Sequence, residues 1–256
     1  MNIAGLQKCS FVDYPGRLSA VVFTRGCNMD CSFCHNRMLV SSDGASQPDL
    51  DGDGVLNLLA RRRGMLDGVV VSGGEPTLQA DLEPFLRRVR ALGYAVKLDT
   101  NGTRPAVLRK LIDAGLLDYV AMDVKAPLNG YERICRTRVD VGAVAESIDL
   151  LLAGRCDYEF RTTFAPELSA EDIVRIALRI HGARSYVLQQ CRPIESEPSD
   201  APAIAPRPDM YVRATAEMLH PFVQHCAVRG VPKRPRPSAP PAREPQADLV
   251  AAGAEG

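Results

Sequence analysis

Short apolar runs alternate along this chain with longer stretches in which apolar residues recur every three or four positions. The short runs are rich in β-branched residues, which is typical of strands. We predict six strands, at residues 20–24, 68–72, 95–99, 119–123, 158–163 and 185–189. Most of these runs show no polar alternation, so we expect both faces of the strands to be covered.

Amphipathic stretches between the strands predict helices. Apolar residues at positions 82, 85, 86, 89 and 92 share one helical face, and Gly93 ends that helix. A second helix is predicted from Thr103 up to Gly115, and a last one over about residues 209–228.

Six strands, each followed by a helix, predict a right-handed parallel α/β array. Six units are fewer than the eight of a closed barrel, so the expected fold class is α/β with an open, partial (β/α)6 barrel. In such folds the chemistry lies at the carboxyl ends of the strands. We expect this domain to cover residues 1–230.

The chain changes character at Val231, where Pro, Ala, Arg and Gly dominate and core-forming residues become scarce. Such a composition cannot bury enough apolar surface to fold. We therefore expect residues 231–256 to form a disordered C-terminal tail.

Composition and charge narrow the function classes. The 256 residues carry 31 basic and 31 acidic side chains, which indicates neither nucleic acid nor a membrane surface as a partner. The first residues lack the basic-then-apolar pattern of a signal peptide, and no apolar run approaches the roughly 20 residues of a membrane span. We therefore expect a cytoplasmic protein with reduced cysteines rather than disulfides.

Three cysteines with the spacing C-x3-C-x2-C follow the first predicted strand: Cys27, Cys31 and Cys34. Three thiolates close together favour a soft metal centre. A structural zinc or an ordinary iron–sulfur site uses four protein ligands, so three indicate an iron–sulfur cluster with one position open to a small molecule.

Two alternatives to an open cluster remain. His35 could complete a Cys3His zinc site, although its position next to Cys34 strains tetrahedral closure. A fourth thiolate from elsewhere in the chain would instead give an electron-transfer cluster. The remaining cysteines are Cys9, Cys135, Cys156, Cys191 and Cys226.

The later predicted strands end in groups suited to ligand binding. The second ends in Ser72-Gly73-Gly74-Glu75, where glycines let the backbone approach a ligand and the carboxylate suits an ammonium or hydroxyl group. The third ends in Asp99-Thr100-Asn101-Gly102, and the fourth in Asp123-Val124-Lys125, whose acid and base share a face. Arg161, inside the fifth, requires a partner such as a carboxylate.

In combination these motifs resemble the radical S-adenosylmethionine (SAM) superfamily. The likeness is carried by the three-cysteine loop, with Phe33 before its last cysteine, and by Ser-Gly-Gly-Glu-Pro at residues 72–76. Asp13-Tyr14-Pro15-Gly16 and Cys34-His35-Asn36 extend it to the glycyl-radical-enzyme activating enzymes. The run Gln189-Gln190-Cys191-Arg192-Pro193 resembles the longer form of the anaerobic ribonucleoside-triphosphate reductase activating protein.

The resemblance implies which residues bind the cofactors. It assigns a [4Fe–4S] cluster to Cys27, Cys31 and Cys34, with SAM on the fourth iron. The residues it places around SAM are Gly73, Gly74 and Glu75 against the methionine amino group, Asn101 near the ribose and Phe33 near the adenine.

Further positions match charged groups of related enzymes. Lys125 and Arg161 are implied as partners of the methionine carboxylate or of the substrate. Asp99, Thr100 and Asp123 match positions that hold a monovalent cation. Two carboxylates that converge beside a cluster would favour such a cation.

The resemblance also implies the reaction. Reductive cleavage of SAM gives methionine and a 5′-deoxyadenosyl radical, which removes a hydrogen atom from a glycine of a glycyl-radical enzyme, here anaerobic ribonucleotide reductase. A reduced flavodoxin- or ferredoxin-type protein is the implied electron donor. The alternatives are a pyruvate formate-lyase-type activating enzyme and a small-molecule radical SAM enzyme such as a deazaguanine-forming synthase.

Overall fold

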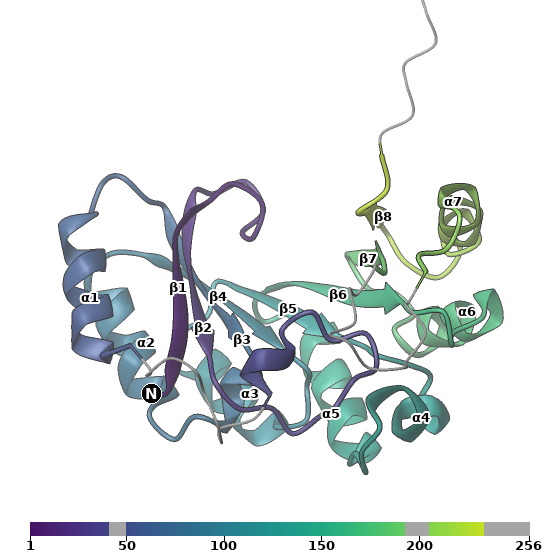
Figure 1. Ribbon diagram of the computed structural model, residues 1–256, viewed down its shortest axis with the longest axis horizontal. Coiled ribbons are helices and arrows are strands. Elements are labelled where there is room, and N and C mark those ends of the chain that lie inside the picture. Colours follow the sequence, from purple (N-terminus) through teal and green to yellow (C-terminus); the bar gives the residue numbers. More distant parts are fainter. Residues whose placement is uncertain (41–49, 193–204, 233–256) are drawn as a thin grey trace, which may run out of the picture.

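The computed structural model describes residues 1–40, 50–192 and 205–232. Its strands form one sheet whose spatial order follows the chain (Figure 1). They are β1 (Ile3–Ser10), β2 (Ser19–Thr24), β3 (Gly68–Gly73), β4 (Ala95–Thr100), β5 (Tyr119–Asp123), β6 (Asp157–Phe164), β7 (Tyr186–Gln190) and β8 (Cys226–Arg229). β1 pairs antiparallel with β2, and every later pair is parallel.

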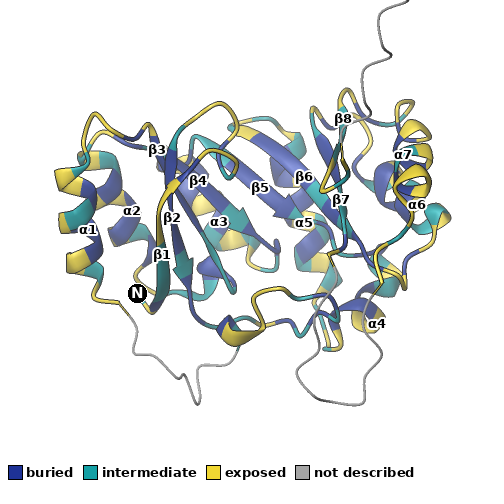
Figure 2. Ribbon diagram, turned by 45° about the horizontal axis from the view of Figure 1, so that its top comes forward, coloured by how far each residue is buried: buried dark blue, intermediate teal, exposed yellow. Residues whose placement is uncertain are grey.

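Helices connect successive parallel strands, as Figures 1 and 2 show. The α-helices are α1 (Gly52–Arg61), α2 (Leu82–Ala91), α3 (Pro105–Asp113), α4 (Tyr131–Cys135), α5 (Val141–Leu152), α6 (Ala170–Arg179) and α7 (Asp209–Glu217). Short 3-10 helices follow β2, β3 and β5, at η1 (Arg37–Leu39), η2 (Pro76–Leu78) and η3 (Leu128–Gly130). The predicted α/β class with a central parallel sheet is confirmed.

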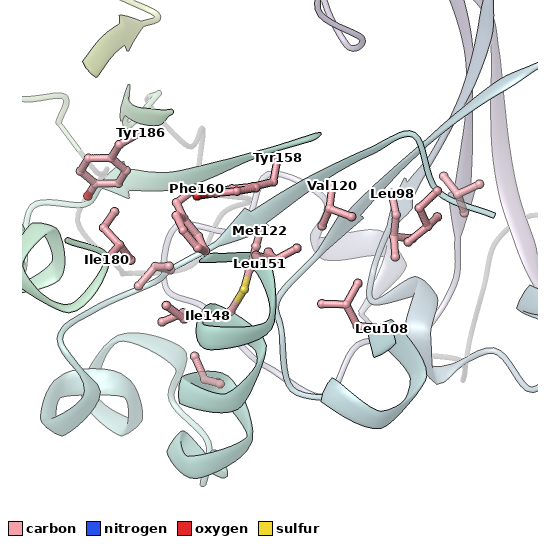
Figure 3. Packing of buried hydrophobic residues seen from close by; sticks show 14 of the residues in the cluster. Leu98, Leu108, Val120, Met122, Ile148, Leu151, Tyr158, Phe160, Ile180 and Tyr186 are labelled. Carbon is pink, nitrogen blue, oxygen red and sulfur yellow. The ribbon is translucent and has the colours of Figure 1, made fainter. Parts of the chain in front are cut away.

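The helix-covered face of the sheet holds the main hydrophobic core. Leu98, Val120 and Met122 of the strands lie against Leu108 of α3 and Ile148 of α5 (Figure 3). All five side chains are buried. Burial of this apolar surface, at about 25 cal/mol per Å², fixes which way each strand faces.

The opposite face of the sheet is also largely buried along β2 to β6, as predicted, but it carries charged side chains. Lys97 and Asp99 of β4 lie on this face, and the strand pairing sets Asp123 of β5 beside Arg161 of β6. Within the described residues, no pairing joins β8 back to β1. The inner face of this open sheet therefore holds charged groups toward the carboxyl ends of the strands.

Tyr14 lies on the inner face, in an apolar cluster. It is buried and packs with Val21 and Val70 near the amino ends of the parallel strands. Its ring centroid lies 6.0 Å from that of Tyr119. The Asp-Tyr-Pro-Gly motif therefore has a packing role at the end of the sheet opposite the cysteine loop.

The two edge strands were not predicted from the sequence. β1 reads as a mixed polar segment because it pairs on only one side. The helix predicted over residues 209–228 is wrong at its end: α7 stops at Glu217, and β8 then pairs with β7. Cys226–Arg229 instead pairs with the open edge of β7, where backbone hydrogen bonding rather than local preference decides the conformation.

The predicted boundary at residue 230 cannot be compared with the fold, because residues 233–256 lie outside the described residues. The division into a domain of residues 1–230 and a tail of residues 231–256 therefore stays a prediction. Among the helices that the structure describes, none is long and apolar enough to cross a bilayer.

Candidate functional site

The three cysteines line one cavity of about 240 Å³ at the carboxyl ends of the parallel strands. Their loop begins directly after β2 and faces the ends of β3, β4, β5 and β6. The predicted residues that line this cavity are Cys27, Cys31, Phe33, Cys34, Gly73, Gly74, Asp99, Thr100, Asn101, Asp123, Lys125 and Arg161. Twelve of the residues predicted from the sequence therefore line one cavity, whereas Glu75 does not line it.

The cysteine loop is fixed by backbone hydrogen bonds at its start. Gly26 has φ +93°, a conformation that favours glycine, and its N–H donates to Leu39 O at 2.7 Å. Cys27 N–H donates to Val40 O at 3.2 Å, and Glu75 N–H donates to Gly26 O at 2.8 Å. The turn after β3 and the loop after β2 therefore form one backbone unit.

Gly74 is required by the close approach of these two turns. A Cβ atom at this position would lie 2.0 Å from Gly26 O and 2.6 Å from Gly26 C. The paired glycines thus let the cysteine loop pack directly on the turn after β3, in addition to any contact with a ligand.

The three thiols differ in how readily they ionise. The pKa of Cys31 is lowered to about 6, by a hydrogen bond from the Cys135 side chain and by the positive charge of Lys125, both acting against burial. Burial raises the pKa of Cys27 to about 11 and also raises that of Cys34. Metal binding therefore has to displace protons from Cys27 and Cys34.

The thiols fit a cluster better than a single ion. Within the described ranges, no three His, Cys, Asp or Glu side chains are placed to hold one metal ion. His35 is exposed, so it does not complete a tetrahedral zinc site with the cysteines in this structure. In a [4Fe–4S] cluster each thiolate binds a different iron atom. Thiols that surround a cavity therefore suit a cluster better than thiols that converge on one ion.

A buried charge cluster lies beside the thiols. The Arg161 guanidinium bridges two carboxylates, with Nε 2.8 Å from Asp123 Oδ1 and Nη1 3.4 Å from Asp99 Oδ2. Lys125 Nζ lies 2.8 Å from Asp123 Oδ2, and Lys97 pairs with Asp99. Burial alone would raise the pKa of both carboxyls, but these cations hold the pKa of each below its usual range.

These ion pairs involve the same carboxylates that the sequence predicts to bind a monovalent cation. The sequence predicts a monovalent cation at Asp99, Thr100 and Asp123 because two carboxylates converge there. In the structure three cationic side chains already face the two carboxylates. Thr100 donates to Glu75 Oε1 at 2.8 Å instead. The charge balance of the cluster therefore needs no added cation.

The same cluster predicts a pH dependence of folding stability. Because the carboxyl pKa values are lower in the folded chain, the ion pairs stabilise the fold above the unfolded pKa of about 4. That stabilisation is lost as the pH falls through the lower folded pKa. We expect Asp123→Asn to lower the unfolding free energy at neutral pH and to flatten its loss below about pH 4.

Urea unfolding between neutral pH and acid pH measures this effect. Asp113→Asn, at an exposed carboxylate paired with Arg155, is the matched control and should keep the wild-type slope. The same pH slope in wild-type protein and the Asp123→Asn variant would show that the buried cluster contributes nothing to it.

Glu75 lies behind the cavity rather than in its lining. Its carboxylate is fully buried and accepts hydrogen bonds from Thr77, from Thr100 Oγ1 and from Asn101 N–H, the last at 2.6 Å. Burial raises the pKa of Glu75, and these bonds oppose that rise. In this structure the Glu75 carboxylate holds the ends of β3 and β4 together, and its predicted contact with the methionine amino group stays a prediction.

Asn101 links the end of β4 to the cysteine loop. Its Nδ2 donates to Asn28 Oδ1 at 2.9 Å, and Asn28 in turn donates to Thr103 Oγ1 at 2.8 Å. Phe33 lies on the other side of the loop, with its ring 5.7 Å from Lys125 Nζ. Both residues line the cavity, as predicted.

Sequence reasoning missed several lining residues. They are Met29, Asn36, Val40, Thr163 and Gln189. Thr163 follows Arg161 on the same face of β6 and is paired with Gln189 of β7, so strand periodicity could have identified both. The other three lie in the cysteine loop and its continuation, where no periodic pattern marks a side chain that faces a cavity.

A second cavity, of about 480 Å³, adjoins the first at the open side of the sheet. The two share His35, Arg161, Thr163 and Gln189. Val12 and Asp13, in the turn between β1 and β2, line one side of it, and Arg229 of β8 lies on the other. The cysteine-lined cavity thus adjoins a polar opening between the two edges of the sheet.

Comparisons with known proteins agree with this geometry. The model of the Radical SAM superfamily matches residues 21–180. A Methanocaldococcus jannaschii protein named “Putative glycyl-radical enzyme activating enzyme” is 32% identical over 237 residues, covering 90% of this chain and 96% of that protein. The Escherichia coli pyruvate formate-lyase 1-activating enzyme is 32% identical over 131 residues, 48% of this chain and 52% of that enzyme.

A solved structure has the same fold. Streptococcus suis SuiB superposes with a TM-score of 0.62 at 13% identity, over 82% of this chain and 48% of SuiB. This chain therefore spans about half the length of SuiB, and the likeness concerns the fold.

Proposed function

This chain belongs to the radical SAM superfamily, and we propose that it activates a glycyl-radical enzyme, with anaerobic ribonucleotide reductase as its partner. The family implies a [4Fe–4S] cluster and SAM. The observation that carries the proposal is the single cavity in which the cysteine loop meets the ends of β3 to β6. A relative that matches nearly the whole chain supports the activating-enzyme class.

The residues of the cavity have distinct proposed roles. Cys27, Cys31 and Cys34 would hold the cluster, which when bound supplies the electron for reductive cleavage of SAM. Backbone groups of Gly73 and Gly74 would receive the methionine amino group. The cysteine loop after β2 and the turn after β3 would exclude water from the reacting atoms and keep those atoms in place.

Charge supports the binding of the methionine carboxylate near Arg161 and Lys125. The buried cluster holds three cationic groups against two carboxylates, so it carries an excess positive charge. Both residues line the cavity. Asn101 is proposed near the ribose and Phe33 near the adenine, where an aromatic face and an amide suit those groups.

The open side of the sheet supports a protein partner. A glycine can reach the cavity only on a flexible segment of another chain, and the adjoining cavity of about 480 Å³ offers a polar passage for it. The ribonucleotide reductase assignment is supported by the run Gln189-Gln190-Cys191-Arg192, which starts at the end of β7. A reduced flavodoxin- or ferredoxin-type protein is the proposed electron donor.

An anaerobic panel experiment tests the partner. The reconstituted protein is mixed with SAM, a chemical reductant and either anaerobic ribonucleotide reductase or pyruvate formate-lyase. We expect electron paramagnetic resonance (EPR) to show a glycyl radical on the reductase. A radical only on the lyase would reassign the partner, and SAM cleavage with a radical on neither would favour a small-molecule substrate.

A further inference from the structure

The junction between the two cavities is lined by side chains from three parts of the chain. The cysteine-lined cavity and the second cavity share His35 of the cysteine loop, Arg161 and Thr163 of β6, and Gln189 of β7. A segment that enters from the open side of the sheet and reaches the cysteines therefore passes these four residues. Their chemistry indicates what kind of segment the junction can hold.

Thr163 and Gln189 lie side by side at the carboxyl ends of their strands. The parallel pairing of β6 with β7 sets Thr163 and Gln189 in register, so their side chains project from the same face of the sheet. Both residues line both cavities. Neighbouring strands are about 4.8 Å apart, so one hydroxyl and one carboxamide can contact the same bound segment.

The arginines beside this pair already have partners. Arg161 is held by the two carboxylates of the buried charge cluster. Arg229, in register with Gln189, directs its guanidinium to the buried Glu159 carboxylate, with two hydrogen bonds of 3.0 and 2.7 Å. Arg192 is exposed and lines the second cavity alone, so it lies outside the junction. The junction therefore offers little unpaired charge to a ligand.

The polar groups of Thr163 and Gln189, in contrast, are uncommitted. Across residues 1–40, 50–192 and 205–232, neither side chain makes a hydrogen bond, and neither is sealed off among the buried polar atoms that lack a partner. A hydroxyl and a carboxamide together supply donors and acceptors without charge. A peptide group likewise has one donor and one acceptor and no charge. An extended polypeptide backbone therefore complements this pair.

We propose that Thr163 and Gln189 bind the backbone of the partner segment that carries the glycine and guide that glycine from the second cavity toward the cysteines. The inference rests on the proposed function, and it adds the residues that hold the protein substrate. Hydrogen-atom removal requires the glycine Cα to be held close to the reacting centre. Two hydrogen bonds to the backbone on either side of a strand pair would limit how that segment slides and turns.

The test compares Thr163→Val and Gln189→Met with the wild-type chain after anaerobic reconstitution. Both changes remove the polar group at similar volume, and Thr163→Ser restores the hydroxyl. Radical formation on anaerobic ribonucleotide reductase is followed by EPR at increasing reductase concentration. We expect kcat/KM for the reductase to fall about 2- to 10-fold in each variant, as for the loss of one hydrogen bond, and to stay near the wild-type value in Thr163→Ser.

Cleavage of SAM without the reductase shows whether the cofactor site is intact. We expect iron content, the cleavage rate and KM for SAM to remain at wild-type values in both variants. Gln224→Met is the matched control, because Gln224 is exposed and lines neither cavity. It should leave every one of these quantities unchanged.

Two results would overturn the inference while leaving the proposed function in place. The first is an unchanged kcat/KM for the reductase in Thr163→Val and Gln189→Met. The second is a raised KM for SAM without the reductase, since the pair would then contact the cofactor. If the wild-type chain forms no radical on the reductase, the proposed partner is wrong, and the same kinetics on pyruvate formate-lyase decide the inference. A radical on neither enzyme would overturn the proposed function and the inference with it.

Discussion

Cys31→Ala is expected to abolish both cluster binding and reductive cleavage of SAM. Cys31 is the thiol with the lowest pKa of the three, about 6, and it lies at the centre of the loop between two backbone bonds to α4. With two thiolates left, an iron–sulfur cluster loses the ligand set that fixes its open position. Iron and sulfide analysis and chromatography of 5′-deoxyadenosine measure the two losses.

Cys9→Ala provides the control for Cys31→Ala. Cys9 is an exposed, free thiol on β1 that does not line the cavity. This variant should keep wild-type iron and wild-type SAM cleavage. If Cys31→Ala retained the same iron and activity as Cys9→Ala, the three-cysteine site would be the wrong description of this protein.

Gly74→Ala is expected to have the second largest effect, although it removes no polar group. The added methyl carbon would lie 2.0 Å from the Gly26 carbonyl oxygen, and backbone atoms cannot move aside as a flexible side chain can. The turn after β3 must then separate from the start of the cysteine loop. We expect a loss of about 1–3 kcal/mol in unfolding free energy, together with loss of SAM cleavage.

Urea unfolding and 5′-deoxyadenosine formation measure these two effects on the same preparation. Gly52→Ala is the matched control, because a Cβ atom at Gly52, at the start of α1, would meet nothing within 4 Å. It should leave cleavage unchanged. Wild-type stability and cleavage in Gly74→Ala would show that the close contact between the two turns does not hold the loop.

The regular parts of the fold could be predicted from the sequence. The six central strands are continuous apolar or β-branched runs, and their local pattern agrees with their place in the sheet. The strands at the two edges could not be predicted in this way. Cys226–Arg229 becomes a strand because β7 offers an unpaired edge, which is a property of the assembled sheet rather than of four residues.

The site residues were predictable by type and position, but their partners were not. The sequence at the end of β5 predicts that Asp123 and Lys125 share one face, and in the structure Lys125 Nζ lies 2.8 Å from Asp123 Oδ2. The ion pair between Lys97 and Asp99 could not be predicted from the sequence, because a lysine in a strand is expected to be exposed. The predicted cation site at Asp99, Thr100 and Asp123 stays a prediction.

Cys135 illustrates the same limit on sequence reasoning. Its spacing from the three-cysteine motif carries no signal, and a single cysteine on a short helix reads as a small buried apolar residue. Its carbonyl oxygen accepts a hydrogen bond from Asp30 N–H of the cysteine loop at 2.9 Å, a contact that only the folded chain creates.

The central claim is that this chain removes a hydrogen atom from a glycine of a protein partner, and isotope transfer tests it most directly. Anaerobic ribonucleotide reductase is prepared with glycine deuterated at Cα and mixed anaerobically with the reconstituted protein, SAM and reductant. We predict that 5′-deoxyadenosine gains one deuterium while a glycyl radical forms on the reductase. 5′-Deoxyadenosine that forms without deuterium, and no radical on the reductase, would contradict the account.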